Sequence, residues 1–222
     1  MFFRRRPRPD TRADRWRTLA TRLDLVDASD HAERVRRWLD LDAATLAPLY
    51  ALRRPGLPST FLFDALSERR GPSGAVRVLH RYCLVRSESE VSRIAFRATA
   101  RQDKVLESLQ ASRSGAVRVA FPHAPSFDQA VSLYARDATT LTPLLTQPLR
   151  SVLQRLLAER AASGTELVVG ARHMVVRFVA SEDDDLTLLE QLLADSLSLA
   201  SLLPAVQRAH DELSVDDLLD VP

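Results

Sequence analysis

The five histidines and the single cysteine are the side chains of this chain best suited to act as nucleophile, base or metal ligand. Cys83 could form a thiol–imidazole pair with His80, His123 or His173, provided that a nearby cation or helix N-terminus lowered the thiol pKa. A small structural cysteine is the simpler interpretation. No two histidines have i,i+4 spacing and no Cys-x-x-Cys occurs, so we expect no metal site.

The remaining motifs give no stronger indication of catalysis. Gly71-Pro72-Ser73-Gly74 lacks the spacing of a nucleophile elbow, and no glycines have the arrangement of a phosphate-binding loop. Asp183, Asp184 and Asp185 could hold a divalent cation. Acidic residues at the start of a helix are explained equally well by the helix dipole. The sequence therefore predicts no cofactor and no catalytic residue.

Arginine placement favours binding rather than catalysis. Lysine and arginine total 31, of which one, Lys104, is lysine; this skew can reflect genomic composition as much as function. Residues 76–84 and 92–98 alternate with a period of two, which predicts two strands joined as a hairpin. The outward face of that hairpin, extended by a third strand at 117–121, would present five arginines: Arg77, Arg81, Arg93, Arg97 and Arg118.

Such a face could contact nucleic-acid phosphates or another acidic partner, because guanidinium groups bind both. Sheets that bind single strands also present aromatic side chains for base stacking. Tyr82 and Phe96 have the opposite parity and are expected on the core side. The alternative interpretation is a solvated face, or arginines packed against the carboxylates of neighbouring helices.

The two ends of the chain carry opposite charge. Residues 1–17 have a net charge of +5 and residues 181–222 a net charge of −10. Phe2 and Phe3 precede four arginines, so residues 2–8 could make weak peripheral contact with an anionic membrane. The C-terminal tail mixes acids with apolar residues suited to binding a partner: Leu213, Val215, Leu218 and Leu219.

Such a tail suits folding onto a basic, apolar groove of the same chain, of a second copy or of another protein. The opposite charges of the two ends favour self-association.

Apolar spacing predicts four segments: a flexible basic arm at 1–11, a helical segment at 12–54, an α+β core at 59–203 and an acidic tail or short helix at 204–222. The helical segment should hold three helices, the third near Leu46 and Leu49. Pro55-Gly56-Leu57-Pro58 marks the boundary with the core.

Within the core we expect helices at 105–109, 149–157 and 186–200 and further strands at 131–134, 167–169 and 174–179. The last two strands should form a hairpin. The predicted fold class is α+β: a mainly antiparallel sheet of about five or six strands, packed by helices and closed by a long C-terminal helix.

Composition bounds the remaining properties. A chain of 222 residues with 45% hydrophobic and 27% charged residues is typical of a globular protein. One cysteine excludes an internal disulfide framework, and no apolar run is long enough to predict a transmembrane helix. The expected location is the cytoplasm.

The opening Trp16-x-x-Leu19-Ala20-x-x-Leu23 is similar to the start of a group of uncharacterised bacterial proteins. The run Phe127-Asp128, then Leu144-Leu145-Thr146, a leucine helix, a hairpin and a final leucine helix also resembles that group. The resemblance covers residues 13–203 and implies a bacterial protein of unknown function, with no activity or functional residue to transfer. Some members of the group look membrane-anchored at the N-terminus, where this chain has no apolar helix.

These observations favour a non-enzymatic protein that acts by binding other macromolecules, with proteins as the first choice. The alternative is a nucleic-acid-binding protein that uses the arginine-rich sheet face. The third hypothesis is a small-molecule enzyme without a recognisable motif.

Overall fold

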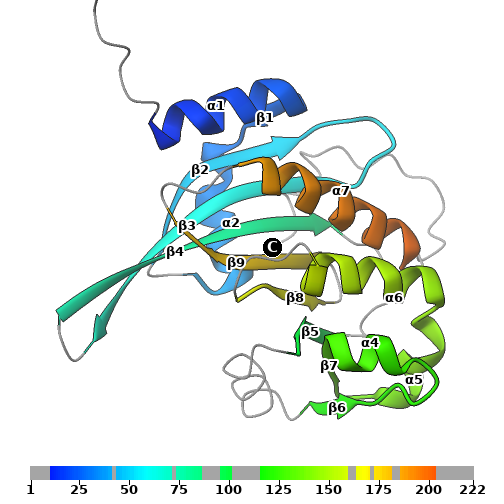
Figure 1. The fold of residues 1–222 in the computed structure, drawn as a ribbon. Coiled ribbons are helices and arrows are strands. Elements are labelled where there is room, and N and C mark those ends of the chain that lie inside the picture. Colours follow the sequence, from blue (N-terminus) through cyan, green and yellow to red (C-terminus); the bar gives the residue numbers. More distant parts are fainter. Residues whose placement is uncertain are drawn as a thin grey trace, which may run out of the picture.

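Nine strands form one antiparallel sheet in the computed structural model, which describes residues 11–41, 44–71, 74–86, 96–101, 116–159, 164–170, 173–181 and 186–203 (Figure 1). The strands are β1 (Leu25–Asp27), β2 (Thr45–Leu52), β3 (Thr60–Gly71), β4 (Gly74–Arg86), β5 (Phe96–Ala100), β6 (Val117–Val119), β7 (Val131–Ala135), β8 (Glu166–Val169) and β9 (His173–Ala180). Their order across the sheet is β1-β2-β3-β4-β9-β8-β5-β7-β6. Sequence neighbours β4 and β5 are therefore separated by β9 and β8.

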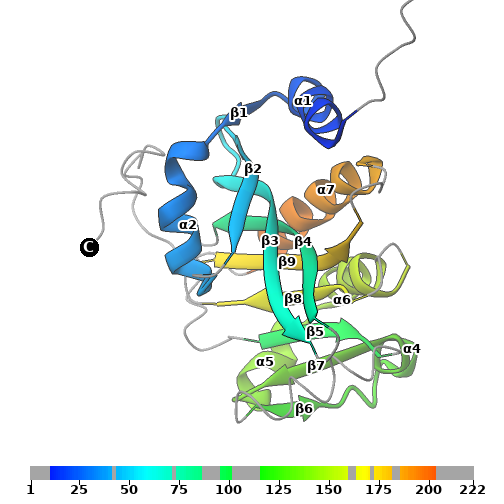
Figure 2. The same ribbon diagram turned by 90° about the vertical axis from the view of Figure 1, so that its left-hand side faces the viewer.

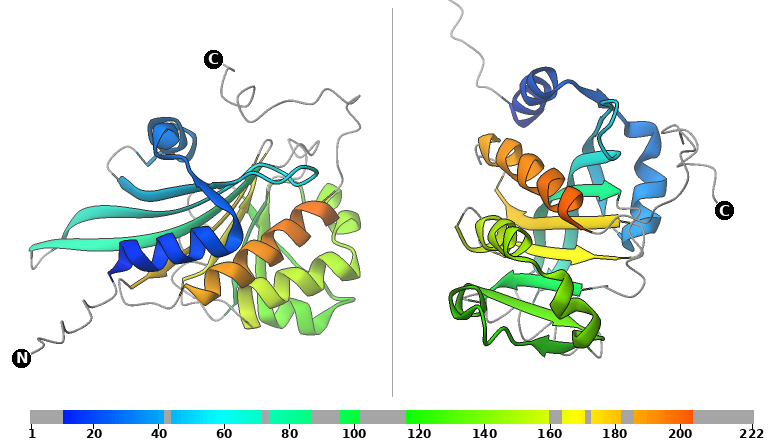
Figure 3. Two further views of the ribbon diagram at one scale, coloured as in Figure 1. Left: turned by 90° about the horizontal axis from the view of Figure 1, so that it is seen from above. Right: turned by 90° about the vertical axis from the view of Figure 1, so that its right-hand side faces the viewer.

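The described helices lie on both faces of the sheet. They are α1 (Arg12–Leu23), α2 (Ala32–Leu39), α4 (Pro125–Ala130), α5 (Ala138–Leu144), α6 (Gln147–Gln154) and α7 (Thr187–Leu202), with a 3-10 turn at Ser29–His31 and a π-helical turn at Arg155–Glu159 that continues α6. Figures 2 and 3 show α1, α4, α6 and α7 on one face, which we call the first face, and α2 on the other, the second face.

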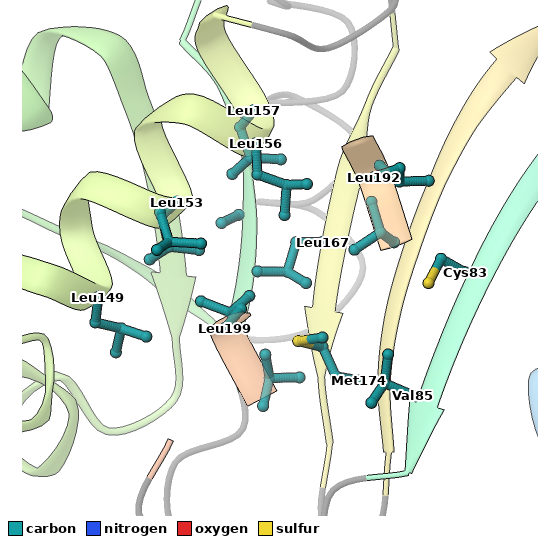
Figure 4. Close-up of a cluster of buried hydrophobic side chains, with 14 of the residues drawn as sticks. Cys83, Val85, Leu149, Leu153, Leu156, Leu157, Leu167, Met174, Leu192 and Leu199 are labelled. Atoms are coloured by element: carbon teal, nitrogen blue, oxygen red, sulfur yellow. The ribbon is translucent and has the colours of Figure 1, made fainter. Parts of the chain in front are cut away.

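The main core lies between the sheet and the helices of the first face. Leu149, Val152 and Leu153 recur at helical spacing on α6, and their side chains are buried. Figure 4 shows leucines of α6 and Leu199 of α7 lying toward Leu167 of β8. Full burial of each such side chain stabilises the fold by about 1.5–3 kcal/mol, so this layer supplies much of the driving force for folding.

A second, smaller core lies between α2 and the middle of the sheet. Val35 of α2 is fully buried in it with Phe61 and Phe63 of β3 and Tyr82 of β4. The rings of Phe63 and Tyr82 stack with centroids 4.8 Å apart. The central parts of β3 and β4 are thus covered on both faces, whereas the end of their hairpin near Arg77 is exposed.

A buried carboxylate fixes α1 on the first face. Asp64 of β3 accepts hydrogen bonds from Arg12 Nε at 2.9 Å, Trp16 Nε1 at 2.9 Å and Arg81 Nε at 3.1 Å. Burial raises the pKa of Asp64, against the opposing attraction of Arg81 and Arg12. The cluster is therefore costly in desolvation, and it specifies where α1 sits more than it stabilises the fold.

The predicted fold class is confirmed, with helices packed on a mainly antiparallel sheet and a long C-terminal helix. The sheet has nine strands among the described residues, against the five or six predicted. The hairpin at 167–179 is confirmed as β8 and β9, with Leu167 opposite Val176. The helix predicted at 149–157 is confirmed as α6 and its π-helical turn.

Two predicted elements are wrong. Residues 45–52 form strand β2 and not a third N-terminal helix, because they pair with β3; Pro48 lies where the register shifts between Leu46 and Leu49. Strands β4 and β5 do not form a hairpin, since β4 pairs with β3 and β9 while β5 pairs with β7 and β8.

The predicted boundary at residues 55–58 is a connection between β2 and β3, which pair in the same sheet. The predictions for residues 1–10, for the helix at 105–109 and for the tail at 204–222 lie outside the described residues.

Candidate binding surface

The five arginines predicted to share one face are divided by the structure. Arg81 is 1% exposed and lies in the core of the first face against Asp64. Arg77 is exposed near the turn of the β3–β4 hairpin, 3.9 Å from Glu68. Arg93 lies outside the described residues, as do the tail residues Leu213, Val215, Leu218 and Leu219.

The prediction that Arg81 lies on an exposed face is therefore wrong. Alternation along β4 separates two sets of side chains, but around Arg81 both faces of this central strand are covered, so neither set is solvated there. The Cys83 side chain shares the first face with Arg81 and is also buried.

Arg97 and Arg118 do share a face, and two further arginines join them. Arg97 and Arg118 both lie opposite Tyr134, on the two strands that flank β7. Arg101, in the turn that follows β5, is paired with the same carboxylate as Arg118, that of Asp128. Arg177 faces Glu166, which faces Thr99, and so belongs to the same second face. We call Arg97, Arg101, Arg118 and Arg177 the arginine face.

Glu166 is the carboxylate beneath two of these arginines. It is 1% exposed and accepts from Arg177 Nε at 2.6 Å and from Arg97 Nη1 at 3.4 Å. Burial disfavours the charged Arg177 guanidinium, but Glu166 and a hydrogen bond with Tyr82 together raise the pKa of Arg177 above its ordinary value. Arg177 stays charged and is held in place.

Asp128 of α4 forms ion pairs with the other two arginines, Arg101 and Arg118. Its carboxylate lies 3.0 Å from Arg118 Nη2 and 3.5 Å from Arg101 Nη1, and it also accepts from the Phe121 backbone N–H at 3.2 Å. Asp128 thereby ties α4 to the ends of β5 and β6.

Counted over the described residues, the arginine face carries more positive than negative charge. Four guanidinium groups share two carboxylates, and their side chains are 34–41% exposed. Neighbouring strands lie about 4.8 Å apart, so the backbone positions of Arg97 and Arg118 are about 10 Å apart. An extended anionic segment can contact both arginines at that spacing, since it is about the length of three residues of an extended chain.

One exposed valine borders the arginine face, and a second lies farther away on the same side of the sheet. Val179 lies two residues beyond Arg177 on the same side of β9 and is 48% exposed. Its cross-strand partner is His80 of β4, and Val76, further along the same side of β4, is 47% exposed. The surface thus offers an aliphatic side chain next to guanidinium groups. Tyr134, between Arg97 and Arg118, is buried and presents no ring for base stacking.

The environment of Cys83 does not suit a catalytic thiol. Cys83 is fully buried, and burial raises the pKa of its thiol to about 12, against a small opposing effect of a hydrogen bond with Ser196. A thiol with that pKa is neutral at physiological pH and is a poor nucleophile. Within the described residues no three His, Cys, Asp or Glu side chains are grouped so that they could hold a metal ion.

We expect Cys83 to resist thiol reagents in the folded chain. Reaction needs both access and the thiolate, and the folded chain supplies neither, so labelling should proceed only through unfolding. The measurement is the rate of disulfide exchange with an aromatic disulfide reagent at pH 8, with and without denaturant. A rate in native buffer equal to that of the denatured chain would contradict this burial.

With the geometry described, the fold can be compared with known proteins. The chain shares its fold with a transport factor. The solved structure of the mycobacterial trehalose monomycolate transport factor A has a TM-score of 0.58 to this chain and 10% sequence identity, over 89% of this chain and 98% of that one. No family model matches the sequence, and no curated protein matches it. Among the described helices none is both long and apolar enough to span a membrane.

Sequence reasoning missed four members of this site. Arg101 and Arg177 were not predicted to join the arginines, nor Glu166 and Asp128 to share them. The hairpin of β8 and β9 was predicted, so the opposition of Glu166 and Arg177 followed from its register and could have been found. The pairing of β5 with β8, which brings Arg97 to the same carboxylate, carries no local signal.

Proposed function

We propose that this chain is a non-enzymatic bacterial protein that acts by binding another protein, through an acidic segment of that partner seated on the arginine face. The observation that carries the proposal is the sharing of two carboxylates by four partly exposed arginines. A carboxylate-rich segment would complete the pairing, because guanidinium groups bind carboxylates with two parallel hydrogen bonds.

An exposed valine beside the arginines supports a protein partner over a simple anion. Interfaces combine apolar anchors with arginine, and Val179 supplies apolar area next to Arg177. The fold supports a binding role only in general terms: the same architecture is used by a protein described as a transport factor. The neutral, buried thiol of Cys83 argues against a cysteine enzyme.

Nucleic acid is the second candidate, since phosphates also bind arginine. Single-strand binding sheets add exposed aromatic rings to their cationic groups. Tyr134, the ring set between Arg97 and Arg118, is buried, which favours the protein partner.

The test uses a fluorescent synthetic peptide of alternating glutamate and leucine residues, titrated into the full chain and followed by anisotropy. The titration uses a variant in which the five acidic residues of the tail are replaced by their amides, and we call it the chain with amidated tail acids. The replacements keep the tail from competing with the peptide for the arginine face: Asp211→Asn, Glu212→Gln, Asp216→Asn, Asp217→Asn and Asp220→Asn. We expect Arg97→Gln with Arg118→Gln to weaken binding about 5- to 20-fold, since each exposed charge pair contributes about 0.5–1 kcal/mol.

The matched control is Arg37→Gln with Arg53→Gln, two exposed arginines outside the arginine face that change the net charge equally. Binding should change less than about twofold in this control, because distant exposed charges are screened. No binding of the peptide, or equal weakening in both pairs of variants, would refute the proposal. A duplex or single-stranded oligonucleotide that binds more tightly than the peptide would favour the second candidate instead.

A further inference from the structure

We infer that the arginine face has an internal ligand: the acidic segment 211–220 of the same chain binds there and must be displaced by a partner. This inference rests on the proposed function and names the regulation of the same site. It assigns a role to the most strongly charged part of the sequence.

Charge complementarity is the first argument. Residues 211–220 hold five acidic side chains and no basic one. Within the part of the chain that the structure describes, the arginine face holds four guanidinium groups against two carboxylates, which leaves an excess of positive charge. The segment and the face therefore attract each other over the distances within one chain.

The apolar residues of the segment are the second argument. Leu213, Leu218 and Leu219 alternate with the acids, as in segments that fold onto a surface that is both basic and apolar. The border of the arginine face supplies an aliphatic counterpart in Val179, which is 48% exposed. Charge alone would suit any acidic peptide, whereas this combination matches the composition of the tail.

The length of chain after α7 is the third argument. The last described residue is Leu203, which is buried on the first face. Residues 204–210 can span up to about 25 Å when extended, so they leave the acidic segment attached but able to reach away from the buried Leu203. Attachment to the same chain gives it an effective concentration in the millimolar range, so even weak contacts hold it.

The consequence is competition at the arginine face. A partner must displace the segment before it can bind this face. Its apparent affinity is therefore its intrinsic affinity multiplied by the fraction of chains whose face is vacant. Salt should weaken the internal contact as well as the external one, because both depend on the same arginines.

The first experiment compares peptide binding by the natural chain and by the chain with amidated tail acids. The probe is the same glutamate–leucine peptide. We expect the natural chain to bind it at least about tenfold more weakly, because the attached segment competes at millimolar effective concentration. Equal affinity of both chains would overturn the internal ligand and leave the proposed function standing. No binding by either chain would overturn the proposed function itself.

The second experiment observes the segment directly. Because Cys83 is buried and its thiol neutral, Ser214→Cys provides one reactive thiol for a nitroxide label. We expect a slowly moving component in the electron paramagnetic resonance spectrum that is independent of protein concentration. Arg97→Gln with Arg118→Gln should convert it to fast motion, while Arg37→Gln with Arg53→Gln should leave it unchanged.

The other outcomes of this experiment decide against the proposal. A slow component that grows with protein concentration would place the segment on a second copy of the chain. A spectrum of fast motion alone, or one that does not respond to the arginine face variants, would show that the segment does not bind there.

Discussion

Replacing Trp16 with alanine is expected to lower the free energy of unfolding by about 3–5 kcal/mol. Trp16 is 0% exposed and is the largest of the fully buried side chains. Its ring stacks on Tyr50 with centroids 5.8 Å apart, and its indole N–H donates to Asp64 at 2.9 Å. The substitution removes packing and a buried donor together. Urea denaturation followed by far-ultraviolet circular dichroism measures the loss.

The second tryptophan of the chain provides the matched control. Trp38 of α2 is 42% exposed, so Trp38→Ala should change the free energy of unfolding by less than about 1 kcal/mol. Trp16→Phe keeps most of the ring and removes the N–H, and it should cost an intermediate amount of about 1–2 kcal/mol. Equal losses from the two alanine variants would contradict the position of α1 on the sheet.

The elements that were predicted correctly are those whose environment has one buried side. In α6 and α7 the leucines recur at helical spacing because each helix buries one stripe. The hairpin of β8 and β9 was found because two apolar strands flank a short connection containing Gly170.

Strands β3 and β2 were missed for different reasons. Strand β3 has Phe61 and Phe63 under α2 and Leu62 under the helices of the first face, so it shows no alternation. Strand β2 has Leu46 and Leu49 at a spacing that imitates a helix. Its strand conformation is determined by pairing with β3. That pairing is a contact between two separate segments and produces no pattern in the sequence of either one.

The arginine face was half predicted for the same reason. Parity along one strand places Arg97 correctly relative to its own neighbours, but the choice of face depends on which strands pair. The predicted pairing of β4 with β5 put Arg81 beside Arg97, whereas β9 and β8 lie between their strands. Composition could not separate the arginine that is buried against Asp64 from those that reach the surface.

Two buried carboxylates show how one residue type serves two purposes. Asp64, on the first face, forms an ion pair with Arg81, which is itself buried. This cluster positions α1. Glu166, on the second face, forms ion pairs with Arg97 and Arg177, whose side chains remain partly exposed. The first cluster is closed to solvent and structural. The second holds charged groups ready at a surface while neutralising part of their charge.

Replacing Glu166 with glutamine is therefore expected to separate stability from binding. The free energy of unfolding should fall by about 1–3 kcal/mol, because Arg97 and Arg177 lose the charged acceptor of their hydrogen bonds. The loss stays in this range because both partly exposed guanidinium groups can turn toward water. Binding of the acidic peptide should strengthen about 3- to 10-fold, since the ligand no longer competes with a carboxylate 2.5 Å from Arg177. Urea denaturation and peptide anisotropy, both in the chain with amidated tail acids, measure the two effects.

The control for this prediction is Glu68→Gln, which makes the same change of charge. Glu68 is exposed, 3.9 Å from Arg77 on the β3–β4 hairpin and away from the arginine face, so the free energy of unfolding and the peptide affinity should both stay nearly constant. Weaker peptide binding by Glu166→Gln would mean that Glu166 orients Arg97 and Arg177 for the ligand more than it competes with it. In that case the second carboxylate, like Asp64, would be a positioning residue, and the binding surface would depend on its charge rather than be restrained by it.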